Sequence, residues 1–223
     1  MFDSRARRRR LPVLVLALAL YVIVRAANTS RGDSTPPREG SPATRPASAT
    51  PSTAPSATTP SSYDPADYAS QVRSRARQTG VSARLLMAIL YNESCKPHVP
   101  SLERAWQKYK PDAAFGIANM HRTTFDEVKK GRDFADRSWE ELPDDRDLAI
   151  EAEAWYLHDL AAELPADRTA PCTKDELLAL GYNMGGGNML AFARGAAPVS
   201  QARSCLDRLR PNWAEAGRAV GGG

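Results

Sequence analysis

The first 62 residues constrain what this chain can fold into more than any other feature. Met1–Arg10 contains five arginines, and Leu11–Val24 follows as fourteen residues without a charge. A basic start followed by an apolar stretch of this length is typical of a secretory signal, and snorkelling arginines at its ends would also let it anchor in a membrane. We therefore expect residues 1–27 to be a signal peptide or a membrane anchor, with the rest of the chain outside the cytoplasm.

A linker and one folded domain are expected after this leader. Residues 28–62 are rich in Pro, Ser, Thr and Ala, with seven prolines between Pro36 and Pro60. Such a composition buries too little apolar surface to fold, which predicts a disordered linker. The 161 residues from 63 to 223 suffice for one hydrophobic core.

The charge balance excludes one class of partner. The first 62 residues contain nine arginines and three acidic residues, whereas the remainder contains 21 basic and 23 acidic residues. Basicity therefore belongs to the leader, and the folded part has no basic stripe of the kind that binds nucleic acid. We expect a monomer that does not bind nucleic acid.

Helix signals recur through residues 63–223, and no segment shows the sustained alternation of β-branched residues that indicates strands. Asp64-Pro65 is typical of a helix start, and Thr173 with Glu176 forms a capping-box pattern. The sequence therefore predicts an all-α domain. Helices are expected over 65–78, 82–93, 101–109, 124–131, 144–164, 173–183, 188–193, 200–209 and 212–219, with Ser101 capping the third and Thr123 or Thr124 the fourth.

One acidic residue occupies a position where the helical pattern calls for a core residue. Ser82 is a good N-cap, and Leu86, Ile89 and Leu90 share one face of the helix that follows. Glu93 is the next position on that face. Burial there would raise the pKa of Glu93 and let it deliver a proton near neutral pH. The alternative is a frayed helix end with Glu93 in solvent.

Three segments resemble a known family when they are read in order. Glu93-Ser94 comes first, then Phe115-Gly116-Ile117-Ala118-Asn119-Met120, then Gly181-Tyr182-Asn183-Met184-Gly185-Gly186. The order and the residues of these segments resemble those of the transglycosylase SLT family of lysozyme-like cell-wall enzymes. That family carries Glu-Ser, then Gly-Leu-Met-Gln, then Ala-Tyr-Asn-Ala-Gly. Pro97-His98-Val99-Pro100-Ser101 also resembles the family's Pro-x-x-x-Ser segment. The resemblance covers roughly residues 70–195.

The resemblance implies a lysozyme-like fold for residues 63–223 and a lytic transglycosylase acting on peptidoglycan glycan strands. Glu93 would be the sole catalytic acid/base for the MurNAc-GlcNAc β-1,4 bond, and the product would end in 1,6-anhydro-muramic acid. The reaction needs neither a metal nor an organic cofactor. Asn119 and Ala118 depart from the family pattern, which has glutamine and methionine there. The residues implied to line the sugar cleft are Ser101, Asn119, Met120, Tyr182 and Asn183.

Two other functions remain open. A hydrolytic muramidase would need a second carboxylate to activate water, for which Asp112, Asp126 and Asp144 are candidates. A membrane-tethered protein that binds glycan without cleaving it is the other alternative.

The cysteines and tryptophans give weaker signals. Outside the cytoplasm, three cysteines suggest one disulfide, either Cys172–Cys205 or Cys95–Cys172. The four tryptophans are expected in the core, with Trp106 the best candidate for stacking on a sugar.

Overall fold

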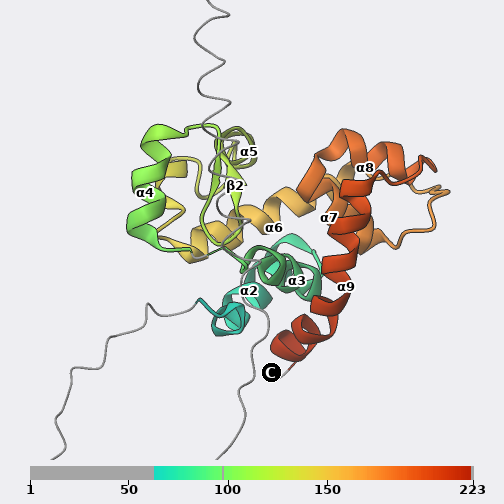
Figure 1. Ribbon diagram of the computed structural model, residues 1–223, viewed down its shortest axis with the longest axis horizontal. Coiled ribbons are helices and arrows are strands. Elements are labelled where there is room, and N and C mark those ends of the chain that lie inside the picture. The colour runs from blue at the N-terminus through green and yellow to red at the C-terminus, as the bar shows by residue number, and fades with distance from the viewer. Residues whose placement is uncertain (1–62, 97, 222–223) are drawn as a thin grey trace, which may run out of the picture. The chain divides into compact units, whose positions relative to one another are not determined.

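The computed structural model describes residues 63–96 and 98–221, and this part of the chain is mostly helical (Figure 1). The expected leader and linker, residues 1–27 and 28–62, lie outside the described residues. Within the described residues, no helix is long and apolar enough to cross a membrane. The elements are η1 (Pro65–Tyr68), α2 (Ala69–Thr79), α3 (Ala83–Glu93), α4 (Pro100–Tyr109), β1 (Ala114–Phe115), β2 (Met120–His121), α5 (Arg122–Val128), η2 (Trp139–Glu141), α6 (Arg146–Glu163), α7 (Lys174–Met184), α8 (Gly186–Ala193) and α9 (Ser200–Gly221).

Helix α3 lies at the centre of the core. It packs against α2, α6, α7 and α9, and Figure 1 shows it between α2 and α9. All six residues from Leu85 to Leu90 are at most 3% exposed. A helix that is apolar on every side belongs in the interior. The predicted single stripe was therefore too narrow, because α3 is surrounded rather than laid on a surface.

Several predicted helix boundaries are confirmed. The Ser82 hydroxyl accepts a hydrogen bond from the Leu85 amide at 3.2 Å, and the Asp64 carboxylate accepts one from the Ala66 amide at 2.9 Å. Gly80 ends α2 in the left-handed conformation. Thr173 and Glu176 form the predicted capping box at the start of α7. These features were predictable because each depends on residues only a few positions apart.

Other boundaries were predicted wrongly. Helix α4 begins at Pro100, so Ser101 lies inside it and is not its cap. Helix α5 begins after His121 without a side-chain cap, rather than at Thr123 or Thr124. Helix α9 runs through Pro211 instead of breaking into two helices. Buried residues on both sides of Pro211, Leu209 and Ala216 among them, pack into the core and offset the backbone hydrogen bond that proline cannot donate.

A short antiparallel hairpin is the exception to the all-α prediction. Strands β1 and β2 pair Ala114 with His121 and Phe115 with Met120. The intervening turn contains Gly116 and Asn119, which both have positive φ angles, +72° and +50°. Four paired residues are too few to give an alternating pattern, so the sequence did not reveal these strands.

Neither predicted disulfide is present, since all three cysteines are free. Cys205 lies on the buried side of α9, Cys172 is half-buried before α7, and Cys95 is exposed after α3. The prediction rested on the count of cysteines alone, which does not fix whether their side chains point toward one another.

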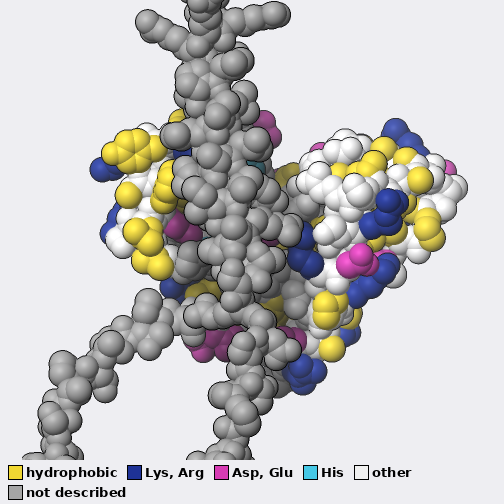
Figure 2. Space-filling model, in the orientation of Figure 1, with side chains coloured by type: hydrophobic (Ala, Val, Ile, Leu, Met, Phe, Trp, Pro, Cys, Tyr) yellow, Lys and Arg dark blue, Asp and Glu magenta, His cyan; other side chains and the backbone are white. Residues whose placement is uncertain are grey.

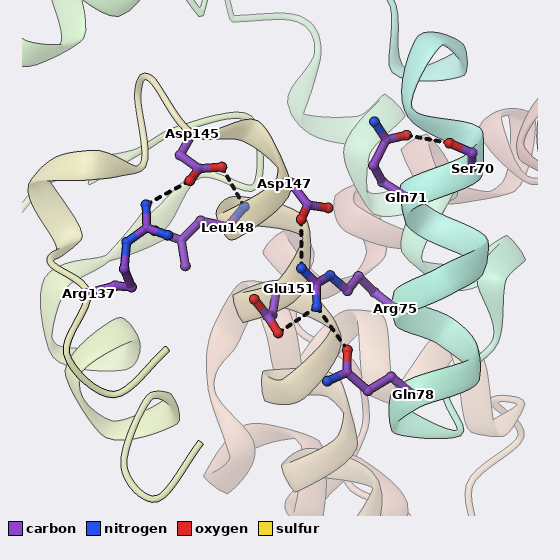
Figure 3. A network of polar contacts seen from close by, with 9 residues as sticks. All are labelled: Ser70, Gln71, Arg75, Gln78, Arg137, Asp145, Asp147, Leu148 and Glu151. Atoms are coloured by element: carbon purple, nitrogen blue, oxygen red, sulfur yellow. Dashed lines mark hydrogen bonds and ion pairs between the residues drawn. The ribbon is translucent and has the colours of Figure 1, made fainter. Parts of the chain in front are cut away.

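A polar network fixes the start of α6 against α2 (Figure 3). The Arg75 guanidinium contacts Asp147 at 2.6 Å and Glu151 at 2.7 Å. Asp145, which caps the N-terminus of α6, accepts a hydrogen bond from the Leu148 amide at 3.0 Å. Its carboxylate also pairs with Arg137 at 2.7 Å. Charged pairs that are partly shielded from water hold geometry better than exposed ones. The Arg75 pairs therefore link α2 to the first turns of α6, the helix that also contains the buried Glu153.

The outer face of α4 presents large apolar side chains to solvent, visible as yellow groups at the left of Figure 2. Leu102 is 56% exposed, Trp106 53% and Tyr109 80%. Trp139, by contrast, is 1% exposed, and its ring edge packs on Phe115. The prediction of a core tryptophan is confirmed for Trp139, whereas Trp155 and Trp213 are only half-buried. The stacking of Trp106 on a sugar stays a prediction.

Candidate active site

The hairpin turn between β1 and β2 requires glycine at position 116. Gly116 has φ +72°, and a Cβ atom built on it would lie 2.8 Å from the Leu142 carbonyl oxygen. The Asn119 amide donates to the Gly116 carbonyl oxygen at 2.8 Å and closes the turn. The turn therefore has a fixed shape, with backbone groups of Gly116 and Ala118 available to partners from elsewhere in the chain.

Glu93 is the last residue of α3, and its side chain is only 13% exposed. The Lys96 ammonium lies 3.0 Å from one carboxylate oxygen, Oε2, and is itself 46% exposed. The sequence left two interpretations open for Glu93, a buried core position and a solvated helix end. The observed position is intermediate, since Glu93 is neither in the core nor freely solvated. The Glu93 side chain is therefore largely covered by protein and keeps a small part exposed at the end of α3.

The backbone of Glu93 is connected to the hairpin turn through two side chains of the α4 region. His98 Nε2 lies 3.0 Å from the Glu93 carbonyl oxygen, and His98 Nδ1 lies 3.0 Å from Glu103 Oε1. The second carboxylate oxygen, Glu103 Oε2, accepts a hydrogen bond from the Gly116 amide at 2.9 Å. The first and second sequence motifs are thus joined by a continuous chain of hydrogen bonds.

The third motif reaches the same turn from the end of α7. The Tyr182 hydroxyl donates to the Ala118 carbonyl oxygen at 2.6 Å. Burial raises the pKa of Tyr182 well above its usual range, and the nearby carboxyl groups of Glu153 and Glu93 act in the same direction. Helix α7 ends here because Gly185, with φ +86°, turns the chain into α8. The second and third motifs therefore meet at one turn. Glu93 of the first motif is connected to this turn through His98 and Glu103, and lies within electrostatic range of Tyr182.

A comparison with protein-family models gives one match, to the transglycosylase SLT domain, over residues 70–198. The match spans more than half of the chain and contains all three motifs. The chain belongs to the transglycosylase SLT domain family. This family acts on bacterial cell-wall peptidoglycan, which implies a site of action outside the cytoplasm. No curated protein and no solved structure matched the chain.

The predicted sugar-binding residues of this SLT domain differ in their exposure. Ser101 on α4 and Asn183 on α7 are exposed, and Asn119 is half-exposed in the turn. Met120 is only 3% exposed, and its carbonyl oxygen accepts a hydrogen bond from the Trp139 indole at 2.9 Å. The sugar contacts stay predictions for all of them. Of the five, Met120 has the least side-chain surface to offer a ligand.

A second acid of the SLT domain was missed by the sequence reasoning. Glu153 on α6 is 0% exposed, and neither carboxylate oxygen has a hydrogen-bond partner among the described residues. Burial raises the pKa of Glu153 well above its usual range, and the charge of Glu93 adds to the effect. Glu153 lies on the same helix face as Ala149 and Tyr156, so an acid within an apolar stripe, the signal that identified Glu93, could have identified it too.

The three aspartates proposed as hydrolytic bases have other surroundings. Asp112 and Asp144 are exposed, and Asp144 is paired with Arg104. Asp126 is half-exposed and lies 3.4 Å from the Lys129 ammonium. None of the three contributes to the raised pKa values of Glu153 and Tyr182, whereas Glu93 contributes to both.

Among the described residues, no group of three or more His, Cys, Asp or Glu side chains could hold a metal ion. The expectation of a metal-free reaction stays a prediction. A pocket of about 460 Å³ lies between the first turn of α7 and α9, and Lys174, Leu209 and Trp213 are among its lining residues. It is at the opposite end of α7 from Tyr182, and none of its lining residues belongs to the three motifs. We therefore assign it no part in the candidate active site.

Proposed function

We propose that this SLT domain is a lytic transglycosylase that cleaves the MurNAc-GlcNAc β-1,4 bond of peptidoglycan. The observation that supports it best is the connection of the three motifs: Tyr182 and Glu103 both bond the turn, and the Glu93 carboxyl group lies within electrostatic range of Tyr182. A carboxyl group at a helix end that is largely covered but still 13% exposed can exchange a proton with a glycosidic oxygen that reaches it.

In the proposed reaction Glu93 acts twice. Its carboxylic acid first donates a proton to the glycosidic oxygen, and the bond from that oxygen to C1 of the muramic acid breaks. The Glu93 carboxylate then takes the proton from the C6 hydroxyl of the same sugar as that oxygen attacks C1. The product is a 1,6-anhydro ring, and Glu93 is returned to its protonated form, so one carboxyl group suffices.

Substrate binding is assigned to residues around the turn and at the end of α7. Ser101, Asn119 and Asn183 offer polar groups that solvent reaches. The Tyr182 hydroxyl is already bonded to Ala118, so we propose that it acts mainly by holding the turn, together with the buried Met120. The shorter Asn119, where the family has glutamine, favours a binding position closer to the backbone.

Hydrolysis of the same bond is the main alternative outcome. An inverting hydrolase needs an ionised second carboxylate about 6.5–9.5 Å from the first, with a water molecule between them. Glu153 is the acid that acts electrostatically on this region, but it is fully buried and has a raised pKa. A carboxyl group that is inaccessible to solvent and has a raised pKa is poorly suited to activate water, which favours transfer over hydrolysis.

Mass spectrometry of the fragments released from purified peptidoglycan by the full chain tests the proposal. Transfer gives muramic acid ends that are one water molecule lighter than the reducing ends that hydrolysis leaves. Anhydro ends are expected. Reducing ends would replace the proposal with a muramidase, and binding without release would replace it with a glycan-binding protein.

We further propose that residues 1–27 direct the protein to the membrane, either as a retained anchor or as a cleaved signal. The support is the five arginines followed by fourteen uncharged residues. Membrane fractionation with N-terminal sequencing distinguishes the two, because a cleaved chain leaves the membrane fraction and begins after the apolar segment.

A further inference from the structure

The hydrogen-bond chain between Glu93 and the hairpin turn has a consequence for the mechanism. We infer that His98 and Glu103 are positioning residues for the reaction: together they set the distance between the acid Glu93 and the sugar-binding turn at Gly116. The inference rests on the proposed function, since it takes Glu93 as the acid. We call this pair of side chains the brace.

The brace is built from buried groups. The His98 side chain is 2% exposed and the Glu103 side chain 16%. The His98 and Tyr63 rings pack in a T-shaped arrangement, with ring centroids 5.3 Å apart. Buried polar groups are costly unless they are bonded, and here both ring nitrogens and both carboxylate oxygens have partners. Such a network has few alternative arrangements, so it holds its ends at a fixed separation.

The backbone of His98 supports the same interpretation. Its φ angle is +35°, a positive value that is uncommon for residues other than glycine, although histidine adopts it more often than most. Only one other described non-glycine residue has a positive φ angle, and it is Asn119 in the turn itself. Unfavourable backbone conformations persist where surrounding contacts hold them and are common at functional sites. With this backbone conformation the His98 ring lies against Glu93, with Nε2 at 3.0 Å from the Glu93 carbonyl oxygen.

The number of protons that the hydrogen bonds of the brace require suggests how to test it. A carbonyl oxygen only accepts, so His98 Nε2 must donate to Glu93. The contact between His98 Nδ1 and Glu103 then needs one further proton, carried by the ring or by the carboxyl group. A glutamine at position 103 would carry that proton on its amide nitrogen, while its oxygen accepts from Gly116. Glu103→Gln should therefore preserve the brace, whereas Glu103→Leu should break it.

The experiment measures kcat and KM on soluble glycan strands for the full chain and three variants. Glu103→Leu is expected to lower kcat by up to about 100-fold with a smaller change in KM, because a displacement of about 1 Å in an active site can have that effect. Glu103→Gln is expected to stay within about threefold of the unsubstituted chain. Glu127→Leu is the matched control, since Glu127 is exposed on α5 and its side chain has no hydrogen bond or ion pair among the described residues.

His98→Asn provides an independent test. Asparagine tolerates the positive φ angle but is too short to contact Glu93 and Glu103 together. Its loss of kcat should match that of Glu103→Leu, and the double variant should be no worse than either, because both changes break one network. Exchange of the Gly116 amide hydrogen should accelerate in Glu103→Leu and not in Glu103→Gln, which reports the bond without any turnover.

The outcomes separate the two proposals. If the unsubstituted chain releases no fragments, the proposed function fails and the positioning role fails with it. If that chain is active and Glu103→Leu keeps its kcat, only the positioning role is overturned. Equal losses in Glu103→Gln and Glu103→Leu would also overturn the brace, since charge rather than the two hydrogen bonds would then matter.

Discussion

Two acids of this SLT domain, at the end of α3 and in the middle of α6, lie within electrostatic range of each other but in different surroundings. Glu93 ends its helix, is 13% exposed at the side chain and pairs with Lys96. Glu153 is in mid-helix, fully buried and without a hydrogen-bond partner among the described residues. A helix end leaves room for a ligand and for loop residues, whereas a mid-helix position facing the core leaves neither. In our proposal the partly exposed acid at the end of α3 reacts, and the buried acid in the middle of α6 has a structural role.

The largest effect on activity is expected from substitution of Glu93, the acid that we propose to react. Glu93→Gln keeps the shape of the side chain but removes the acid, and activity should fall about 10²–10⁴-fold, the usual contribution of a general acid. Fragment release from peptidoglycan is the measurement, with thermal unfolding to show that the fold is intact. Glu163→Gln is the matched control, because Glu163 also ends its helix and is exposed. Retained turnover in Glu93→Gln would remove Glu93 from the mechanism.

The next effect concerns the turn beside Glu93. Gly116→Ala places a methyl group 2.8 Å from the Leu142 carbonyl oxygen, whereas Gly131→Ala, at nearly the same φ of +70°, meets nothing within 4 Å. Gly131→Ala should cost about 1–2 kcal/mol of stability from the backbone conformation alone. Gly116→Ala should cost more and should also lower activity. Urea unfolding of both variants checks this, and equal costs would show that the turn can move away from Leu142.

A smaller effect is expected at the contact between α7 and the turn. Tyr182→Phe removes the hydroxyl and leaves the fully buried Ala118 without that hydrogen bond. An unsatisfied buried acceptor costs about 1–3 kcal/mol. Tyr156→Phe is the control, because that ring packs on Tyr182 at 5.5 Å and its hydroxyl has no hydrogen bond to a described residue. The difference in unfolding free energy between the two variants measures the contribution of the Tyr182–Ala118 hydrogen bond. Identical unfolding curves would show that this bond does not contribute to stability.

The last prediction concerns Glu153, whose substitution by glutamine should leave activity nearly unchanged. Because burial raises the folded-state pKa of Glu153, the folded protein holds a proton there that the unfolded chain releases above its ordinary carboxyl range. The stability of the unsubstituted chain should therefore fall as pH rises above about 4.5, by up to about tenfold per pH unit in the unfolding constant, until the folded-state pKa is reached. Glu153→Gln should remove this dependence.

Melting temperatures of both proteins at several pH values between about 5 and 8 provide the measurement. The variant should gain stability relative to the unsubstituted chain as pH rises. A parallel dependence in the two proteins would mean that Glu153 is ionised in the fold. A loss of activity as large as that of Glu93→Gln would end the distinction between the two acids.

Local sequence patterns were enough to predict part of this structure. The caps at Ser82 and Thr173 and the stop at Gly80 were predictable because their partners are neighbours in sequence. The order of the three motifs also identified the family and indicated Glu93. The continuity of α9 through Pro211 was missed, because long-range packing outweighed the local preference of proline.

The contacts that assemble the site were beyond sequence reasoning. Tyr182 bonds a backbone carbonyl 64 residues away, and Glu103 a backbone amide 13 residues away. A carbonyl or amide group is the same in every residue, so no residue type marks it as a partner. Glu103 also follows Pro100 in the first turn of a helix, where an acid is common for electrostatic reasons alone. His98 carried no sequence signal that distinguished it from a loop histidine.

The three free thiols differ enough in their surroundings to be modified one at a time. Burial raises the pKa of both Cys172 and Cys205, which lowers the thiolate fraction of each at neutral pH. Cys95 is exposed and only two residues from Glu93. A maleimide dye should label it first, so the natural chain already contains an attachment point for a fluorescent reporter of glycan binding, with no substitution needed.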